Sequence, residues 1–258
     1  MKIYPINGIK LSSVFSGMYK KKRLDLSIIE ICSGSIVSGV FTKNKARSDA
    51  VNISQNNLKK SNPKFLVVNS GNANSGTGED GYKDIIKYST KLSKYSGCNI
   101  RDILVFSTGI IGERINSNKI IKAIPSLLKN LNKDKWLDFS NSILTTDKTN
   151  KVVSKRIKLG NEIVTITGVA KGSGMIRPDM ATMLSFVATD MKIDKSSMSK
   201  MHKKFSEKSY NMISVDGETS TNDSSVLIST NSTKTSYKKL SLKNKKYFYE
   251  SLESIYIE

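Results

Sequence analysis

The chain has 258 residues, of which 38% are hydrophobic, so it is long enough to bury a substantial core as one large or two modest domains. Its formal net charge is +20, but the Lys and Arg residues are scattered among Asn and Ser without a zinc-finger, KH or RNP-type motif, which favours a solvated surface over a nucleic-acid interface. No apolar run reaches the roughly 18 residues of a membrane span, and "MKIYPINGIK" lacks the hydrophobic segment of a secretory signal, so we expect a cytoplasmic protein with no membrane partner.

The first half of the chain predicts strands that alternate with small-residue loops. Apolar runs at 24–31 and 35–42 are separated by Cys-Ser-Gly, which is typical of antiparallel strands with a tight connection. A buried strand at 64–68 leads through a glycine-rich loop into a helix that stops at Gly97. The plan of an apolar strand followed by a glycine-containing turn repeats at 102–115.

The second half predicts helices and a hairpin. Helical segments fill about 117–143, with an interruption near Pro125. The apolar segments on either side of Gly160-Asn161 predict a hairpin. Further expected elements are a core strand at 182–190, a helix at 194–210, a strand at the end of 211–230 and an amphipathic helix over the last residues. This mixture of hairpins and strand-to-helix units predicts an α/β or α+β layered fold.

Cysteine and histidine usage limits the chemistry. Cys32 and Cys98 are far apart and match no CxxC spacing, so we expect both to be reduced and in the interior. The single histidine, His202, follows a segment rich in Lys, Ser and Met, and we expect it on the surface. One histidine argues against a metal site built from several histidines and against a Ser-His-Asp arrangement.

The stretch "AKGSGMIRPDMATMLSF", residues 170–186, raises a catalytic hypothesis for Thr182. An N-terminal Thr can use its own α-amine as the base, because that amine has an ordinary pKa of about 7.7 to 8.0. Thr182 is internal, so the chain would first break at Ala181-Thr182 by an N-to-O acyl shift followed by hydrolysis of the ester. Read by itself, an Ala-Thr step that begins a strand is usually an ordinary strand start, and the catalytic interpretation is the less common of the two.

The segment "GVAKGSGMIRPDMATMLSFVATD" resembles the signature of the ArgJ family, the glutamate N-acetyltransferases also called ornithine acetyltransferases. Other blocks resemble the same family in order along the chain. They are "FTKNKARSDAV" (41–51), "VNSGNANSGTGEDG" (68–81), "STGIIGERI" (107–115), "TTD" (145–147) and "NMISVDGETSTND" (211–223). The resemblance extends from about residue 1 to 230.

The resemblance implies an ArgJ/DmpA-like fold of the N-terminal-nucleophile type, with sheets packed between helices. It implies an enzyme of arginine biosynthesis that moves acetyl from N-acetyl-L-ornithine to L-glutamate through an acetyl-threonine, and it leaves the use of acetyl-CoA open. Self-cleavage would divide the chain into an α chain, 1–181, and the N-terminal part of a β chain, 182–258. The cleaved chains would associate as a heterotetramer, and no metal or organic cofactor is implied.

Site residues follow from the resemblance by position. Thr182 matches the nucleophile, and Thr108 with Gly109 matches the pair that stabilises the oxyanion. Lys171 and Thr145 match substrate-binding residues, together with Thr182 itself. Thr146 is an equally suitable hydroxyl beside Thr145. Read alone, the same residues are a glycine turn that closes a strand, a solvated loop lysine and a helix-end cap.

Two polar clusters have simpler interpretations. The loop after residue 68 contains Asn69, Asn72 and Asn74, for which the sequence offers only turn chemistry. The spacing of Asp216, Glu218 and Asp223 fits no EF-hand, so we expect a loop stiffened by side-chain-to-backbone hydrogen bonds rather than a metal site.

Some features depart from the family pattern. Asp179 replaces the usual Asn close to the cleavage position, and "TTDK" replaces "TTDT". The family continues well past residue 258, so we expect a truncated chain that lacks further substrate-contacting residues. The other hypotheses are an inactive fragment, a related N-terminal-nucleophile amidase or aminopeptidase that releases its product to water, and a basic binding protein.

Overall fold

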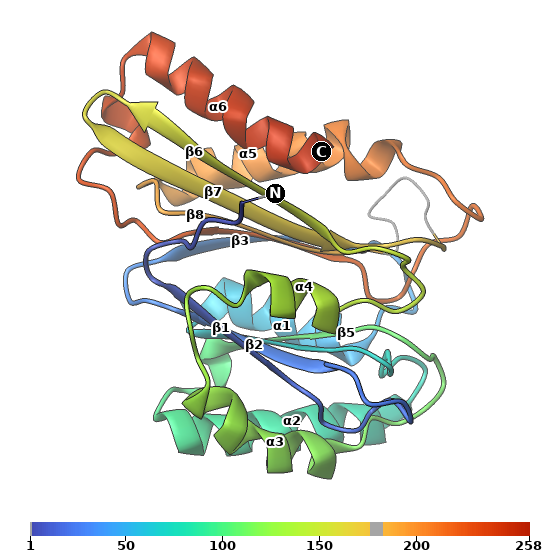
Figure 1. Ribbon diagram of the computed structural model, residues 1–258. Coiled ribbons are helices and arrows are strands. Elements are labelled where there is room, and N and C mark those ends of the chain that lie inside the picture. Colours follow the sequence, from blue (N-terminus) through green and yellow to red (C-terminus); the bar gives the residue numbers. More distant parts are fainter. Residues whose placement is uncertain (1, 176–182) are drawn as a thin grey trace.

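The structure, a computed structural model, describes residues 2–175 and 183–258. Two β-sheets lie face to face, and helices cover the outer face of each sheet (Figure 1). In the described residues the first sheet has the order β1 (Ile9–Val14), β2 (Leu26–Ile31), β4 (Phe65–Asn69), β5 (Ile103–Ser107). The second sheet has the order β3 (Ile36–Phe41), β9 (Ser224–Ser229), β8 (Leu184–Thr189), β7 (Glu162–Lys171), β6 (Lys151–Leu159).

The helices occupy three levels of this layered arrangement (Figure 1). Below the first sheet lie α2 (Gly78–Ser96) and α3 (Ser117–Lys129), and above the second lie α5 (Lys195–Lys208) and α6 (Leu242–Ile257). Between the sheets lie α1 (Asp49–Lys60) and α4 (Trp136–Ser142). Short 3-10 turns at Ile100–Asp102, Tyr210–Met212 and Tyr237–Lys239 complete the described elements. None of the described helices is long and apolar enough to cross a membrane.

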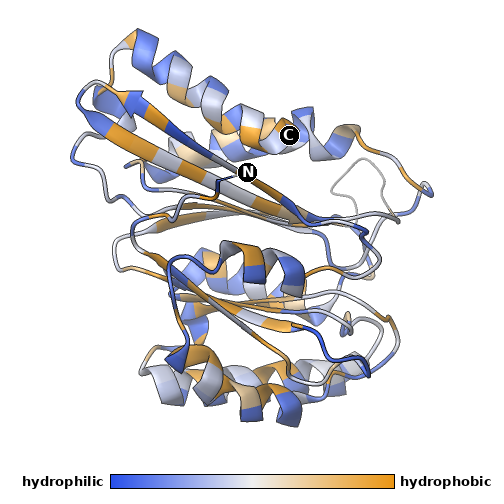
Figure 2. Ribbon diagram, in the orientation of Figure 1, coloured by the Kyte–Doolittle hydropathy of each residue, from blue (hydrophilic) through white to orange (hydrophobic). Residues whose placement is uncertain are grey.

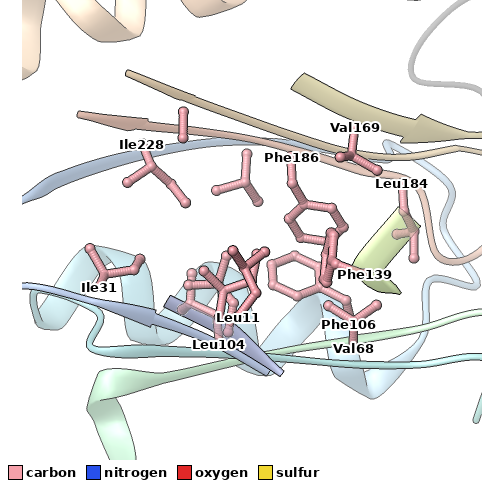
Figure 3. Packing of buried hydrophobic residues seen from close by; sticks show 14 of the residues in the cluster. Leu11, Ile31, Val68, Leu104, Phe106, Phe139, Val169, Leu184, Phe186 and Ile228 are labelled. Carbon is pink, nitrogen blue, oxygen red and sulfur yellow. The ribbon is translucent and has the colours of Figure 1, made fainter. Parts of the chain in front are cut away.

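The hydrophobic core between the two sheets centres on Phe186 of β8 (Figure 3). Its ring packs edge-on against Phe106, with centroids 5.1 Å apart, and against Phe139 of α4, with centroids 5.2 Å apart. Truncating such a buried ring costs about 3–5 kcal/mol. Figure 2 shows hydrophobic residues along the strands and hydrophilic residues on the outer helices, as expected for sheets that are covered on both faces.

Most of the predicted elements are confirmed. The hairpin around Gly160-Asn161 joins β6 to β7 in antiparallel register, and the predicted core strand is β8. The helix that ends at Gly97 is α2, and Gly97 takes the left-handed conformation with φ +68°. The layered α/β fold with sheets packed between helices is likewise confirmed.

Two predictions of local structure are wrong. The runs at 24–31 and 35–42 do form β2 and β3, but these strands belong to different sheets, because β2 pairs with β1 and β4 while β3 pairs with β9. Pro125 does not interrupt a helix, since α3 continues through it to Lys129 and the break comes before α4. Burial of the α3 face that carries Ile120, Ile124 and Leu127 outweighs the one hydrogen bond that proline cannot donate.

Candidate active site

The first part of the site, Thr108 and Gly109, directly follows strand β5. Thr108 is buried, and its backbone N–H donates to the carbonyl oxygen of Asn69 at 3.0 Å. Gly109 has φ +130°, and a Cβ atom at this position would lie 2.4 Å from the carbonyl carbon of Gly71 and 2.5 Å from the backbone nitrogen of Asn72. Only glycine fits this close approach of two backbones.

The asparagines of the loop after β4 build the support beneath this turn. Asn69 donates from Nδ2 to the carbonyl oxygen of Asn72 at 2.8 Å and accepts from Ser107 Oγ at 2.7 Å. The Asn72 side chain donates to the carbonyl oxygen of Glu113 at 2.9 Å and accepts from the backbone N–H of Asn74 at 2.7 Å. These buried side chains hold the two strand ends together, a role beyond the turn chemistry that the sequence offered.

Lys171, the last residue of β7, reaches the same place from the second sheet. The residue is 3% exposed, and its ammonium group donates to Thr108 Oγ1 at 2.6 Å and to Thr145 Oγ1 at 3.3 Å. Burial lowers the pKa of Lys171 to about 8, against the opposing charges of Asp147 and Asp223. The structure thus brings three predicted site residues, Thr108, Thr145 and Lys171, into direct contact.

Asp147 holds the backbone just after Lys171. Its Oδ1 accepts the N–H of Gly172 at 2.8 Å and the ammonium of Lys151 at 2.7 Å. Burial by itself would raise the pKa of Asp147, but these hydrogen bonds and the nearby Lys171 charge hold it below its usual value. Thr146 is exposed and pairs with Ser173 Oγ at 2.6 Å, so it is Thr145 that contacts Lys171.

Asp223 holds the backbone where the chain enters β8. It is 1% exposed, and its Oδ1 accepts the N–H of Met183 at 2.9 Å. Burial raises the pKa of Asp223 to about 8, although hydrogen bonds from Met183 and Ser220 and the charge of Lys171 act in the opposite direction. Met183 directly follows Thr182 in the sequence. Ala181, Thr182 and Asp179 lie outside the described residues.

A cavity of about 570 Å³ opens beside these groups. Lys171, Gly172 and Met183 line it together with apolar side chains from β7, β8 and α6, and Lys151 lies on its wall. A cavity of this size with a mostly apolar lining and a few polar groups is typical of a small-molecule site.

The remaining predicted residues have structural roles. Asp216 accepts the N–H of Met175 at 2.9 Å, so the expected side-chain-to-backbone hydrogen bonds of this loop are present, whereas Glu218 is exposed. Cys32 and Cys98 are free, but both are only half-buried, so the prediction that they lie in the interior is wrong.

The prediction that His202 is a surface residue is wrong. The side chain is fully buried between α5 and the second sheet, and its ring nitrogens contact Ser38 Oγ at 3.0 Å and Ser225 Oγ at 2.9 Å. Burial lowers the pKa of His202 to about 3, so the ring is neutral. Burial of Met198, Met201 and Phe205 on the same face of α5 is the helical pattern that would have placed it correctly.

The chain spans 56% of the length of two proteins that it resembles closely. The arginine biosynthesis bifunctional protein ArgJ of Psychrobacter arcticus is 46% identical over 228 residues, which cover 88% of this chain and 56% of that protein. The protein of the same name from Colwellia psychrerythraea is 43% identical over 237 residues, with the same coverage of 88% and 56%.

Solved structures agree with this relationship. The arginine biosynthesis bifunctional protein ArgJ of Bacillus halodurans matches with TM-score 0.61 and 28% identity, over 69% of this chain and 92% of that one. The ornithine acetyltransferase of Mycobacterium tuberculosis, solved with ornithine, matches with TM-score 0.59 and 25% identity, over 67% and 92%.

A more distant structure shows the fold alone. The L-aminopeptidase D-Ala-esterase/amidase of Ochrobactrum anthropi, described as a variant of the Ntn hydrolase fold, is 10% identical with TM-score 0.53 over 99% of this chain and 85% of that one. The ArgJ family model, by contrast, matches residues 10–258, which is nearly the whole sequence. The chain therefore belongs to the ArgJ family.

Proposed function

We propose that this chain carries the acyl-transfer site of an acetyltransferase of arginine biosynthesis, which moves acetyl from N-acetyl-L-ornithine to L-glutamate through an acetyl-threonine at Thr182. The observation that carries the proposal is the contact between Lys171 Nζ and Thr108 Oγ1, beside the glycine turn at Gly109. Membership of the ArgJ family and the likeness to an ornithine acetyltransferase support the same activity.

The contact with Lys171 orients the Thr108 hydroxyl. An ammonium group only donates, so Thr108 Oγ1 is the acceptor and its own hydrogen is free to point elsewhere. Together with the backbone N–H of Gly109, that hydrogen would stabilise the negative charge that develops on the acetyl oxygen. One such donor contributes about 2.7–4 kcal/mol to the transition state.

Two acyl exchanges at Thr182 make up the reaction. The hydroxyl oxygen of Thr182 bonds to the acetyl carbon of N-acetylornithine, the bond from that carbon to nitrogen breaks, and the ornithine amine leaves with the proton taken from the hydroxyl. The amine of glutamate then attacks the acetyl-threonine, and the threonine oxygen regains a proton. The freed α-amine of Thr182 is the base in both steps, so ping-pong kinetics are expected.

Self-cleavage at Ala181-Thr182 prepares this amine. It yields residues 1–181 as the α chain and 182–258 as part of the β chain, and two copies of each would form a heterotetramer. Lys171 on the wall of the cavity, and Thr145, which contacts its ammonium group, would bind the substrate, with the ammonium facing a carboxylate. Transfer of labelled acetyl to glutamate, the assay given in the next paragraph, also tests acetyl-CoA as a second acetyl donor.

Intact mass is the decisive measurement. The full chain and Thr182→Ala are incubated at neutral pH, and the wild type alone is expected to give fragments of 181 and 77 residues, which together make the 258 residues of the chain. Scission with transfer of labelled acetyl to glutamate supports the whole proposal. Scission in both proteins rejects Thr182 as the nucleophile of cleavage. Scission in neither means that this chain does not assemble the cleavage site.

A further inference from the structure

Asp223 is a buried carboxyl group with no part in the steps above. Its own backbone is fixed, because the carbonyl oxygen accepts the N–H of Thr42 at 2.9 Å, and Ser224 N–H donates to the carbonyl oxygen of Met183 at 3.1 Å. The residue before it, Asn222, donates from Nδ2 to the carbonyl oxygens of Ala73 and Ser107. Asp223 is therefore rigidly placed relative to the strand end that carries Thr108.

One oxygen of Asp223 has a partner and the other does not. Oδ1 accepts the N–H of Met183, while Oδ2 is buried and has no hydrogen-bond partner in the part of the chain that the structure describes. The carboxyl group is therefore held through Oδ1, which fixes its position relative to the N–H of Met183.

Asp147 makes the corresponding contact on the other side of the site. Its Oδ1 accepts the N–H of Gly172, and its Oδ2 is likewise buried without a partner among the described residues. Both carboxyl groups act electrostatically on Lys171, the residue before Gly172. Carboxyl groups thus hold the backbone at Gly172 and at Met183, on either side of the proposed cleavage position.

We propose that Asp223 is a positioning residue for Thr182. By holding the N–H of Met183, it fixes the peptide that joins Thr182 to β8 relative to Thr108 and Lys171. This inference rests on the proposed role of Thr182 as nucleophile. Asp223 acts through its hydrogen bond to the backbone of Met183 and does not exchange a proton with the substrate.

The first test compares self-cleavage rates of full-length variants. Asp223→Ala removes the acceptor and should slow scission about 100-fold, the size of effect that a displacement of about 1 Å produces. Asp223→Asn keeps the acceptor in place and should stay within about threefold of the wild type, whereas Asp223→Glu displaces it by one methylene and should be at least about tenfold slower. If Asp223→Ala does not fold, the order Asn faster than Glu decides the question, and equal rates overturn the proposal.

Asp190 provides a matched control. It is a buried carboxyl at the opposite end of β8, and it too accepts one backbone N–H, that of Thr165 at 2.8 Å. Asp190→Ala should lower thermal stability as Asp223→Ala does but leave the rate of scission within about threefold of the wild type. Equal slowing by both alanine variants would mean a general loss of stability and would overturn the proposal.

Amide hydrogen exchange separates this inference from the proposed function. In the uncut Thr182→Ala chain, Asp223→Ala should speed exchange of the Met183 amide at least about tenfold, and Asp190→Ala should not. Unchanged exchange at Met183 overturns the positioning role. A wild type that is never cut rejects the proposed self-cleavage of this chain, whereas a wild type that is cut no faster than Asp223→Ala rejects Asp223 alone.

Discussion

The side-chain amide of Asn222 donates to the carbonyl oxygen of Ser107 at 2.9 Å, so the residue before Asp223 is tied to the residue before Thr108. The same amide group donates to the carbonyl oxygen of Ala73 at 2.7 Å. One buried side chain just before β9 therefore connects the second sheet to the loop after β4 and to the end of β5 in the first sheet.

Asn222→Ala should lower both stability and activity. It leaves two buried carbonyl oxygens without a donor, at a cost of about 1–3 kcal/mol each in the free energy of unfolding. Self-cleavage should slow as well, because Asp223 and Thr108 lose their common support. Urea unfolding and intact mass measure the two effects. Asn57→Ala removes a single hydrogen bond, from the side-chain amide to the carbonyl oxygen of Ile103 at the far end of β5. It should reduce stability without slowing scission.

Thr108→Val tests the hydroxyl at the proposed oxyanion site. Valine has nearly the same shape but no hydroxyl, so acetyl transfer should fall about 10²- to 10³-fold, as it does when one oxyanion donor is removed. Thr108→Ser keeps the hydroxyl that Lys171 orients and should retain most of the rate. Single-turnover transfer from N-acetylornithine measures the difference, and equal rates for the serine and valine variants would contradict the assignment.

Gly109→Ala should be far more harmful than a change at a neighbouring glycine. Both Gly109 and Gly112 have positive φ, but an added Cβ meets the backbone of residues 71 and 72 at Gly109 and meets nothing within 4 Å at Gly112. Gly112→Ala should therefore cost only the strain of its φ angle, about 1–3 kcal/mol. Gly109→Ala should cost more than this and abolish transfer, and thermal unfolding of the two variants side by side checks the order.

His202 should make the protein sensitive to acid. Its pKa is lowered to about 3 in the fold and lies near 6.5 when the chain is unfolded. Between these values the unfolded chain binds a proton that the folded chain does not, so the stability present above pH 6.5 is lost as the pH falls toward 3. The slope from this residue approaches about 1.4 kcal/mol per pH unit. Urea unfolding from pH 8 to pH 4 should give a shallower dependence for His202→Gln, and parallel curves would refute the cause.

Local sequence patterns predicted where the strands lie better than they predicted which strands pair with one another. Alternation and apolar runs identified β2, β3 and β8, because each run is encoded within a few residues. They did not reveal that β2 and β3 enter different sheets, since the pairing of β3 with β9 joins residues almost 200 positions apart. Pairing of this kind is decided by burial in the whole fold, which neither strand encodes alone.

The same distinction applies to the site. Thr108, Gly109, Thr145 and Lys171 were identified by resemblance, and in the structure Lys171 contacts Thr108 and Thr145. Their roles stay predictions. Asp223 could be interpreted only as a loop residue, because its partner Met183 is 40 positions away in the sequence. His202 was misplaced for a different reason, since the lysines around it obscured the buried face that it shares with Met198 and Phe205.

The position of β9 has a consequence for when the chain can be cut. This strand lies between β3 and β8, so the second sheet stays divided until residues 224–229 are in place. The ribosome adds Thr182 to the chain well before Asp223. A nascent chain that ends between these two residues therefore lacks the carboxyl group that anchors Met183. If the chain is cut at Thr182 as proposed, scission would follow the joining of β3 and β8 through β9, and a chain that has not reached β9 would keep its peptide bond intact.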